Sequence, residues 1–132
     1  MILGIGVDIA KNNRFSSWLK NEKKILRFFH PSEINFSSLS LQMLSSRFAG
    51  KEAFVKALGL GFENIELKSI AVLKNEKGKP YFSLEGEAKK ALERLGGGAV
   101  HLSLSHEKDY AVAFVIIESK ILMDKEGEHF GN

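Results

Sequence analysis

The chain has 132 residues, of which 44% are apolar and 27% are charged, and this length and composition predict one compact domain. It contains no cysteine, which excludes disulfide bridges, thiolate metal sites and a catalytic thiol. No stretch approaches the roughly 20 apolar residues of a membrane span, and residues 1–4 lack the basic start that is typical of a signal peptide. We therefore expect a cytoplasmic protein.

Positive charge is concentrated in residues 9–30. This segment carries a local charge of +5, whereas the net charge of the whole chain is only +3. Its basic side chains are Lys11, Arg14, Lys20, Lys23, Lys24 and Arg27. Such a patch favours an anionic partner, either a nucleic acid or an acidic protein. Charge alone leaves open an ordinary solvated helix face.

Residues 2–9 predict the first strand. Apolar residues recur at every second position there, and Gly4 and Gly6 occupy alternate positions. Glycine in a strand is typical of a site that another backbone approaches closely. The strand ends at a carboxylate, Asp8.

The next elements are predicted to be helical. Residues 15–29 fit one or two short amphipathic helices, and the serine-rich residues 37–46 fit a loop that enters a longer helix over residues 41–58. In this longer helix Lys51 and Glu52 fall within or beside the apolar stripe. An uncompensated carboxylate at such a position would be costly, so Glu52 should have a partner.

The second half predicts a smaller set of strands and one helix. We expect strands at 65–73 and 80–84, a helix at 87–95, and a closing hairpin of 100–105 with 110–118. Residues 111–117 are apolar without alternation, which predicts a strand covered on both faces, one of them in part by another subunit. Residues 1–118 form the predicted domain, and the polar tail 119–132 is expected to be flexible.

The residue pattern points to phosphate chemistry. Asp8 and Glu52 together suit Mg²⁺, which prefers oxygen ligands and also takes water and phosphate oxygens. The alternative is a capping Asp8 and a surface pair of Glu52 with Lys56. Arg47, Lys51 and Lys56 share the helix of Glu52, which suggests a polyanion such as a pyrophosphate. A solvated basic helix remains open at this point.

Several motifs together carry a resemblance to a known family. They are residues 4–9, 47–61, 78–81, 102–106 and 110–113. In order and spacing across about residues 1–118, the chain resembles the bacterial holo-acyl-carrier-protein synthases, which are 4′-phosphopantetheinyl transferases. The most specific element is the Lys-Glu-Ala-Phe-x-Lys-Ala sequence at 51–57.

The resemblance implies a transferase with a defined reaction. It would move 4′-phosphopantetheine from coenzyme A to a serine of apo-acyl carrier protein, with Mg²⁺ as cofactor, releasing adenosine 3′,5′-bisphosphate in fatty acid biosynthesis. The implied fold is α+β, a small, mostly antiparallel sheet with helices packed on one side. The implied assembly is a homotrimer with active sites between subunits, without nucleic-acid or membrane partners.

The resemblance also assigns residues. Asp8 and Glu52 fall on the metal ligands of the family and, with Lys56, on its catalytic positions. The expected coenzyme A contacts are Arg47, Lys56, Gly59, Gly61, Gly78, Lys79, Pro80, Ser105 and His106. Arg14 matches an arginine that contacts the carrier protein, and Lys20 and Lys24 are expected to assist its docking. The candidate base for the serine proton is Glu52, with bulk water or a carboxylate of the carrier as alternatives.

The chain departs from the family pattern at three places. Gly50 stands where alanine is common, Leu60 stands where a threonine is frequent, and the tail runs about a dozen residues further. Two other functions remain open on sequence grounds. One is a small nucleic-acid-binding α+β domain whose aromatic residues stack on bases. The other is a coenzyme A binder without catalytic activity.

Overall fold

A computed structural model describes residues 1–59, 65–120, 122–123 and 129–130. Strands are labelled β, α-helices α and 3₁₀ helices η. The first half contains β1 (Ile2–Lys11), η1 (Asn12–Trp18), α1 (Glu22–Phe28), η2 (Pro31–Glu33), η3 (Phe36–Ser38) and α2 (Leu41–Leu58). The second half contains η5 (Leu67–Ser69), β2 (Ile70–Lys74), β3 (Pro80–Leu84), α3 (Gly86–Leu95), β4 (Gly97–His106), β5 (Tyr110–Ser119), β6 (Leu122–Met123) and β7 (His129–Phe130).

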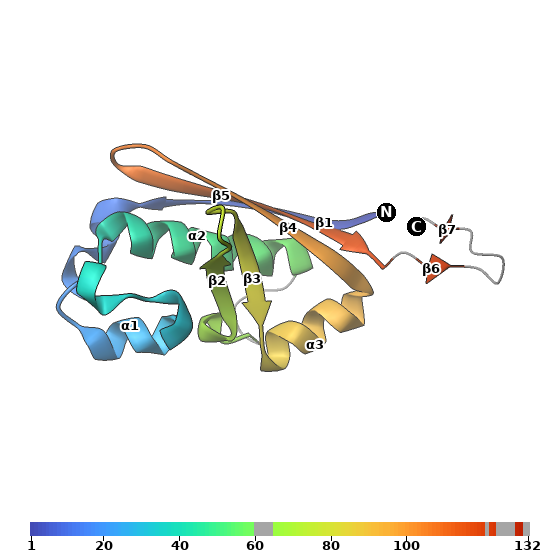
Figure 1. The fold of residues 1–132 in the computed structure, drawn as a ribbon, viewed down its shortest axis with the longest axis horizontal. Helices are drawn as coiled ribbons and strands as arrows, with labels where there is room; N and C mark the ends of the chain where they lie inside the picture. The colour runs from blue at the N-terminus through green and yellow to red at the C-terminus, as the bar shows by residue number, and fades with distance from the viewer. Residues whose placement is uncertain (60–64, 121, 124–128, 131–132) are drawn as a thin grey trace.

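The main sheet has three antiparallel strands in the order β1-β5-β4, and β2 and β3 form a separate antiparallel hairpin. The long helix α2 runs along one face of the main sheet, and no described helix lies on its other face (Figure 1). The expected α+β fold with helices on one side is therefore confirmed. The strand expected over 65–73 is shorter, because residues 67–69 form a 3₁₀ turn and β2 begins at Ile70.

The two glycines of β1 allow the strand to cross α2 in direct backbone contact. A Cβ atom added to Gly4 would lie 1.8 Å from the carbonyl oxygen of Ala57, and one added to Gly6 would lie 1.8 Å from that of Ala53. Only glycine fits at such distances. The sequence prediction of a strand closely approached by other backbone is thus confirmed, and this crossing fixes β1 against the helix that carries Glu52.

The core lies between the sheet and α2, and it continues into an aromatic cluster between α2 and the segment of η1 and α1. Phe15, Trp18, Phe29 and Phe48 are buried there, with ring centroids 5.0–6.3 Å apart. The helix α2 starts at an N-cap, where the Ser40 hydroxyl accepts a hydrogen bond from the Met43 N–H. It ends at Gly59, whose φ of 77° is left-handed.

The strand β5 is covered on only one face in the single chain. Ala111, Ala113, Val115 and Ile117 are buried, whereas Phe114 on the opposite face is 41% exposed. The outer side chains of β1, including Val7 and Ile9, are also exposed. The main sheet therefore presents an apolar outer face, and the cover expected from another subunit would have to lie on it.

Two further observations concern the tail and membranes. In the tail β6 pairs with β7 in antiparallel register. Among the described residues, no helix has the length and apolar character required to cross a bilayer.

Candidate active site

Asp8 and Lys56 form an ion pair where β1 crosses α2. The Lys56 ammonium donates to Asp8 Oδ1 over 3.0 Å and to the Val7 carbonyl oxygen over 3.1 Å. Asp8 is buried, whereas the Lys56 side chain is 54% exposed. Lys56 therefore pairs with Asp8 and remains accessible from solvent, which argues against the alternative of a simple surface pair with Glu52.

Glu52 lies one helical turn before Lys56, beside the carboxyl group of Asp8. Burial, together with the proximity of Asp8, raises the pKa of Glu52 to about 7, and Arg14 and Lys56 partly offset this rise. The Oδ2 atom of Asp8 is buried and has no hydrogen-bond partner among the described residues. Two adjacent carboxylates with an unsatisfied oxygen form a donor set that fits a hard cation.

The raised pKa of Glu52 predicts how the metal-free protein responds to pH. The fold favours the protonated form of the Glu52 carboxyl. Protonation of Glu52 therefore stabilises the folded state fully below pH 4.5, and this stabilisation is lost as the pH rises to about 7. The wild type should therefore lose stability relative to Glu52→Gln between pH 5 and pH 8. Urea unfolding of both proteins in EDTA measures this difference, and a difference that is independent of pH would contradict the assignment.

A cavity of about 620 Å³ opens directly beside Glu52. It is lined by Arg14, Arg27, Phe28, Phe48, Glu52, Ile65, Glu66, Leu67 and Lys68. The guanidinium of Arg14 stacks over the ring of Phe48, with 4.7 Å from its central carbon to the ring centroid. The cavity thus combines an apolar lining with basic side chains near the carboxylates. Sequence analysis did not find most of this lining, because it comes from segments far apart in the chain.

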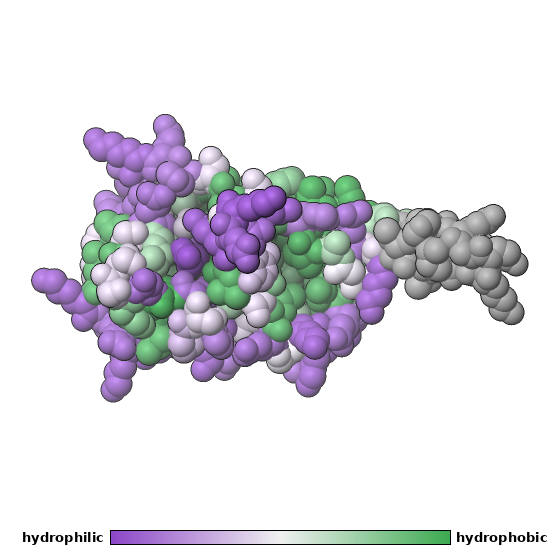
Figure 2. Space-filling view, in the orientation of Figure 1, coloured by the Kyte–Doolittle hydropathy of each residue, from purple (hydrophilic) through white to green (hydrophobic). Residues whose placement is uncertain are grey.

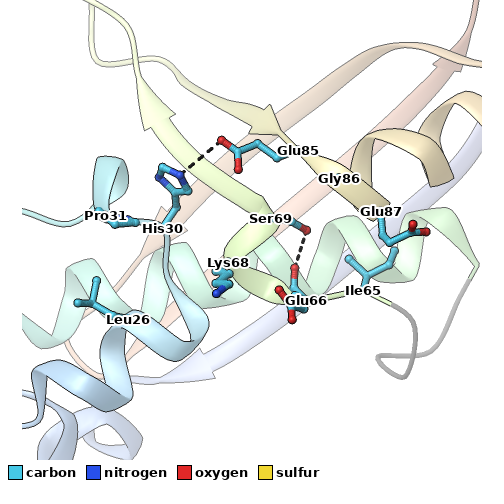
Figure 3. A pocket seen from close by; sticks show the side chains of 10 residues that line it. All are labelled: Leu26, His30, Pro31, Ile65, Glu66, Lys68, Ser69, Glu85, Gly86 and Glu87. Carbon is cyan, nitrogen blue, oxygen red and sulfur yellow. Dashed lines mark hydrogen bonds and ion pairs between the residues drawn. The ribbon is translucent and has the colours of Figure 1, made fainter.

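A larger cavity of about 770 Å³ adjoins the first one and shares Ile65, Glu66 and Lys68 with it. Figure 3 shows His30 pointing across this cavity toward Glu85, and the two side chains lie 3.4 Å apart. Glu66, Glu85 and Glu87 give this cavity an acidic lining. It contains neither Asp8 nor Glu52, so we place the candidate active site at the smaller cavity.

Lys51 has a different role from the one the sequence suggested. Its side chain is fully buried and pairs with Glu33. The expectation that Lys51 contributes to an anion site on α2 is therefore wrong. Glu33, which sequence analysis did not single out, is its partner.

Arg47 lies on the same side of α2 as Lys51. Its Nε atom is buried without a hydrogen-bond partner among the described residues, and burial lowers its pKa while Glu33 partly restores it. Arg47 does not line either of the two cavities. A contact between Arg47 and a ligand held by Glu52 of the same chain thus has no support in the single chain.

The other expected coenzyme A contacts fall into two places. Gly59 directly follows α2 and lies near Lys56, whereas Gly61 falls outside the described residues. Lys79 and Pro80 line a separate depression of about 370 Å³ along the edge of β4. Gly78 lies in the turn before β3, and Ser105 and His106 end β4. A single chain therefore does not bring Lys79 and Pro80 to the cavity of Glu52.

The basic surface around η1 and α1 contains the expected docking residues. Figure 2 shows hydrophilic side chains projecting from the end of the molecule that holds α1. Lys20 is exposed, and the Lys24 ammonium lies 4.8 Å from the ring centroid of Trp18. The nucleic-acid hypothesis requires exposed Phe or Tyr rings for stacking. Phe15 of η1 is buried, whereas Tyr110, which pairs with Lys11 in the main sheet, is 41% exposed. The surface of η1 and α1 therefore offers mainly charge, while exposed aromatic rings, including Phe36 and Tyr81, lie on other parts of the chain.

Comparisons with known proteins converge on one family. Residues 4–115 match the 4′-phosphopantetheinyl transferase superfamily. A holo-[acyl-carrier-protein] synthase of Treponema denticola is 47% identical over 122 residues, 89% of this chain and 99% of that protein. The crystal structure of the Neisseria meningitidis synthase is 36% identical with a TM-score of 0.80, covering 90% of this chain and all of that chain.

A third similar protein was solved with a ligand. The structure of the Bacillus anthracis holo-(acyl-carrier-protein) synthase in complex with CoA (3′,5′-ADP) is 35% identical to this chain, with a TM-score of 0.74. The match covers 91% of this chain and 99% of that chain. The similarity to these proteins therefore extends over the elements that carry Asp8, Glu52 and Lys56.

Proposed function

The chain belongs to the 4′-phosphopantetheinyl transferase superfamily, and we propose that it transfers 4′-phosphopantetheine from coenzyme A to a serine of apo-acyl carrier protein. The reaction would release adenosine 3′,5′-bisphosphate and serve fatty acid biosynthesis in the cytoplasm. The observation that carries the proposal is the group of Asp8, Glu52 and Lys56 beside a cavity with basic and apolar walls. Transfer of a phosphoryl group needs positioning and charge neutralisation, and these residues supply both.

The carboxylates of Asp8 and Glu52 fit Mg²⁺ as its protein ligands. Asp8 Oδ2 is buried and lacks a partner among the described residues, and the described residues contain no group of three or more side chains that could form an all-protein metal cage. Mg²⁺ typically binds one or two carboxylates and completes its shell with water and substrate phosphate. When bound, it would neutralise the pyrophosphate of coenzyme A and orient the phosphoryl group.

Lys56 would stabilise the charge of the leaving group, and Glu52 would accept the proton of the carrier's serine. The exposed Lys56 ammonium, held by Asp8, would stabilise the negative charge that shifts onto the leaving bisphosphate. The serine of the carrier must lose its proton, and we propose the Glu52 carboxylate as the acceptor. In the cavity, the apolar side chains of Phe28, Phe48 and Leu67 would contact the pantetheine arm and exclude water from it.

We propose that the protein is a homotrimer in which neighbours complete each active site. The apolar outer face of the main sheet would be buried between subunits, and the neighbour would supply contacts such as Lys79 and His106. Light scattering should then give about three times the 14.7 kDa chain mass. Phe114→Asp should dissociate the trimer, because it places a charge on this face.

The matched control for the assembly is Leu19→Asp. Leu19 is also an exposed apolar residue, but it lies next to η1 and away from the main sheet. This variant should keep the mass of the wild type. A single-chain mass for the wild type at micromolar concentration would contradict the trimer.

The carrier protein is proposed to dock on the basic surface of η1 and α1. Acyl carrier proteins are acidic, and Arg14 lies between this surface and the cavity of Glu52. Arg14→Glu should raise the Michaelis constant for the carrier at least several-fold, corresponding to the loss of about 1–3 kcal/mol from a charge-assisted contact. Lys20 and Lys24 should mostly accelerate encounter, so their substitution should lower the association rate at low salt.

Steady-state kinetics with each substrate varied in turn test the role of Arg14. The constant for coenzyme A should stay nearly unchanged in Arg14→Glu. An equal rise in both constants would place Arg14 in the coenzyme A site, and no change in either would leave it as an ordinary surface charge.

The proposed reaction itself is tested by product release. Adenosine 3′,5′-bisphosphate should appear from coenzyme A only when apo-carrier and Mg²⁺ are both present. Binding of coenzyme A without any release would support a binder without catalytic activity instead. A steep salt-dependent affinity for arbitrary RNA or DNA, without release, would favour nucleic-acid binding.

A further inference from the structure

A fully buried ion pair joins α2 to the turn after α1, and the proposed reaction does not use it. The Lys51 ammonium lies 2.5 Å from Glu33 Oε2, and both side chains are 0% exposed. Lys51 also donates to the carbonyl oxygens of Leu67 over 3.0 Å and of Ile70 over 2.6 Å. All three N–H groups of the ammonium are therefore engaged, and its charge has no route to a ligand.

Glu33 completes this network from the other side. Its Oε1 atom accepts from the Val72 N–H over 3.0 Å, and its Oε2 atom accepts from the His30 N–H over 2.7 Å as well as from Lys51. Buried ion pairs recover their desolvation cost only when further hydrogen bonds satisfy both groups, and this pair meets that condition. Besides the bond from His30 to Glu33, the pair's hydrogen bonds go to one segment, residues 67–72.

The segment that the pair holds forms a wall of the active-site cavity. Leu67 and Lys68 line this cavity together with Glu52, which is the residue directly after Lys51 on α2. The two consecutive side chains Lys51 and Glu52 thus point to different sides of the same wall. Lys51 points into the protein and binds the backbone of the wall, while Glu52 faces the cavity that this wall encloses.

The pair does not determine how Asp8 and Glu52 lie relative to each other. That relation depends on the contact of β1 with α2, where Gly6 packs on the backbone of Ala53. Loss of the ion pair should therefore displace the wall at 67–68 and leave the two carboxylates in place.

We propose that Glu33 and Lys51 are positioning residues for the pantetheine arm of coenzyme A. Their hydrogen bonds fix the position of residues 67–72 relative to α2. Leu67 is thereby held far enough from Glu52 for the arm to fit between them. The inference rests on the proposed function. It predicts that loss of the ion pair weakens the binding of coenzyme A but not that of adenosine 3′,5′-bisphosphate, which shares the nucleotide portion of coenzyme A and lacks the arm.

Calorimetric titration with both ligands in the presence of Mg²⁺ tests the proposal. Lys51→Met keeps the shape of the side chain but removes the hydrogen bonds to Leu67 and Ile70. It should weaken coenzyme A binding on the order of ten-fold, since small misplacements of a positioning group have large effects, and leave bisphosphate binding unchanged. Leu67→Ala should have the same selective effect, and its combination with Lys51→Met should be less than additive.

A double variant separates positioning from stability. Lys51→Met alone leaves Glu33 as an uncompensated buried charge, whereas Lys51→Met with Glu33→Gln removes both charges. The double variant should regain much of the melting temperature but not the affinity for coenzyme A, because the bonds to the wall are still absent. Glu85→Gln, which removes the charge of the residue that faces His30 at the other cavity, is the control and should bind both ligands like the wild type.

The possible results lead to different conclusions. Equal weakening of both ligands, or wild-type affinity of the double variant for coenzyme A, would overturn the positioning role. A wild-type protein that binds neither ligand would instead overturn the proposed function.

Discussion

Replacement of Asp8 or Glu52 by alanine should abolish most Mg²⁺-dependent transfer, with a loss of turnover on the order of 10²- to 10³-fold, as for removal of one preorganised charge contact. Each change removes one of the two adjacent carboxylates that fit the metal. Asp8→Ala additionally releases Lys56, whose ammonium is held at 3.0 Å. Steady-state rates across a Mg²⁺ titration measure the effect.

The control for this prediction is a carboxylate outside the site. Glu93→Ala changes an exposed residue of α3 and should keep wild-type turnover. Circular dichroism of all three variants should show the wild-type fold. Near wild-type activity of Asp8→Ala or Glu52→Ala at limiting Mg²⁺ would contradict the assignment of the metal ligands.

Gly6→Ala should destabilise the protein by about 4 kcal/mol or more, in the range that only severe core disruption produces. The added Cβ would lie 1.8 Å from the Ala53 carbonyl oxygen, so β1 and α2 would have to separate. That separation would also move Asp8 away from Glu52, and activity should be lost together with stability. Denaturant unfolding measures the change in the free energy of unfolding.

Gly78→Ala is the matched substitution at an open position. Gly78 has a φ of 80°, but no described atom lies within 4 Å of the added Cβ. It should cost only about 1 kcal/mol, because the strain of the left-handed conformation is its only effect. Equal stability changes at the two glycines would contradict the role given to the close crossing.

The local pattern of the sequence was sufficient to predict the main elements of the fold. The alternation of Gly4 and Gly6 with apolar residues indicated a close backbone crossing, which the structure confirms at α2. The apolar period of residues 41–58 likewise matches α2, and the motif resemblance led to the family. The glycine spacing and the apolar period involve residues that are close together in the sequence, and the resemblance rests on direct matching of motifs. The sequence alone can therefore reveal them.

The internal partners of charged residues could not be predicted in the same way. Periodicity placed Lys51 near the apolar stripe but did not reveal Glu33, because that contact spans 18 residues and forms only after α2 packs on η2 and β2. The cavity beside Glu52 combines Phe28 and Leu67 for the same reason. A buried lysine within an apolar stripe is itself a signal that an acidic partner must exist elsewhere in the chain.

The most direct test of the central claim is the mass of apo-acyl carrier protein after incubation with this protein, coenzyme A and Mg²⁺. Mass spectrometry should show the carrier heavier by one phosphopantetheine group, on a peptide that contains its acceptor serine. Replacing that serine by alanine, or adding EDTA, should prevent the gain. A carrier mass that stays unchanged under conditions in which coenzyme A binds to the protein would contradict the proposed transferase activity.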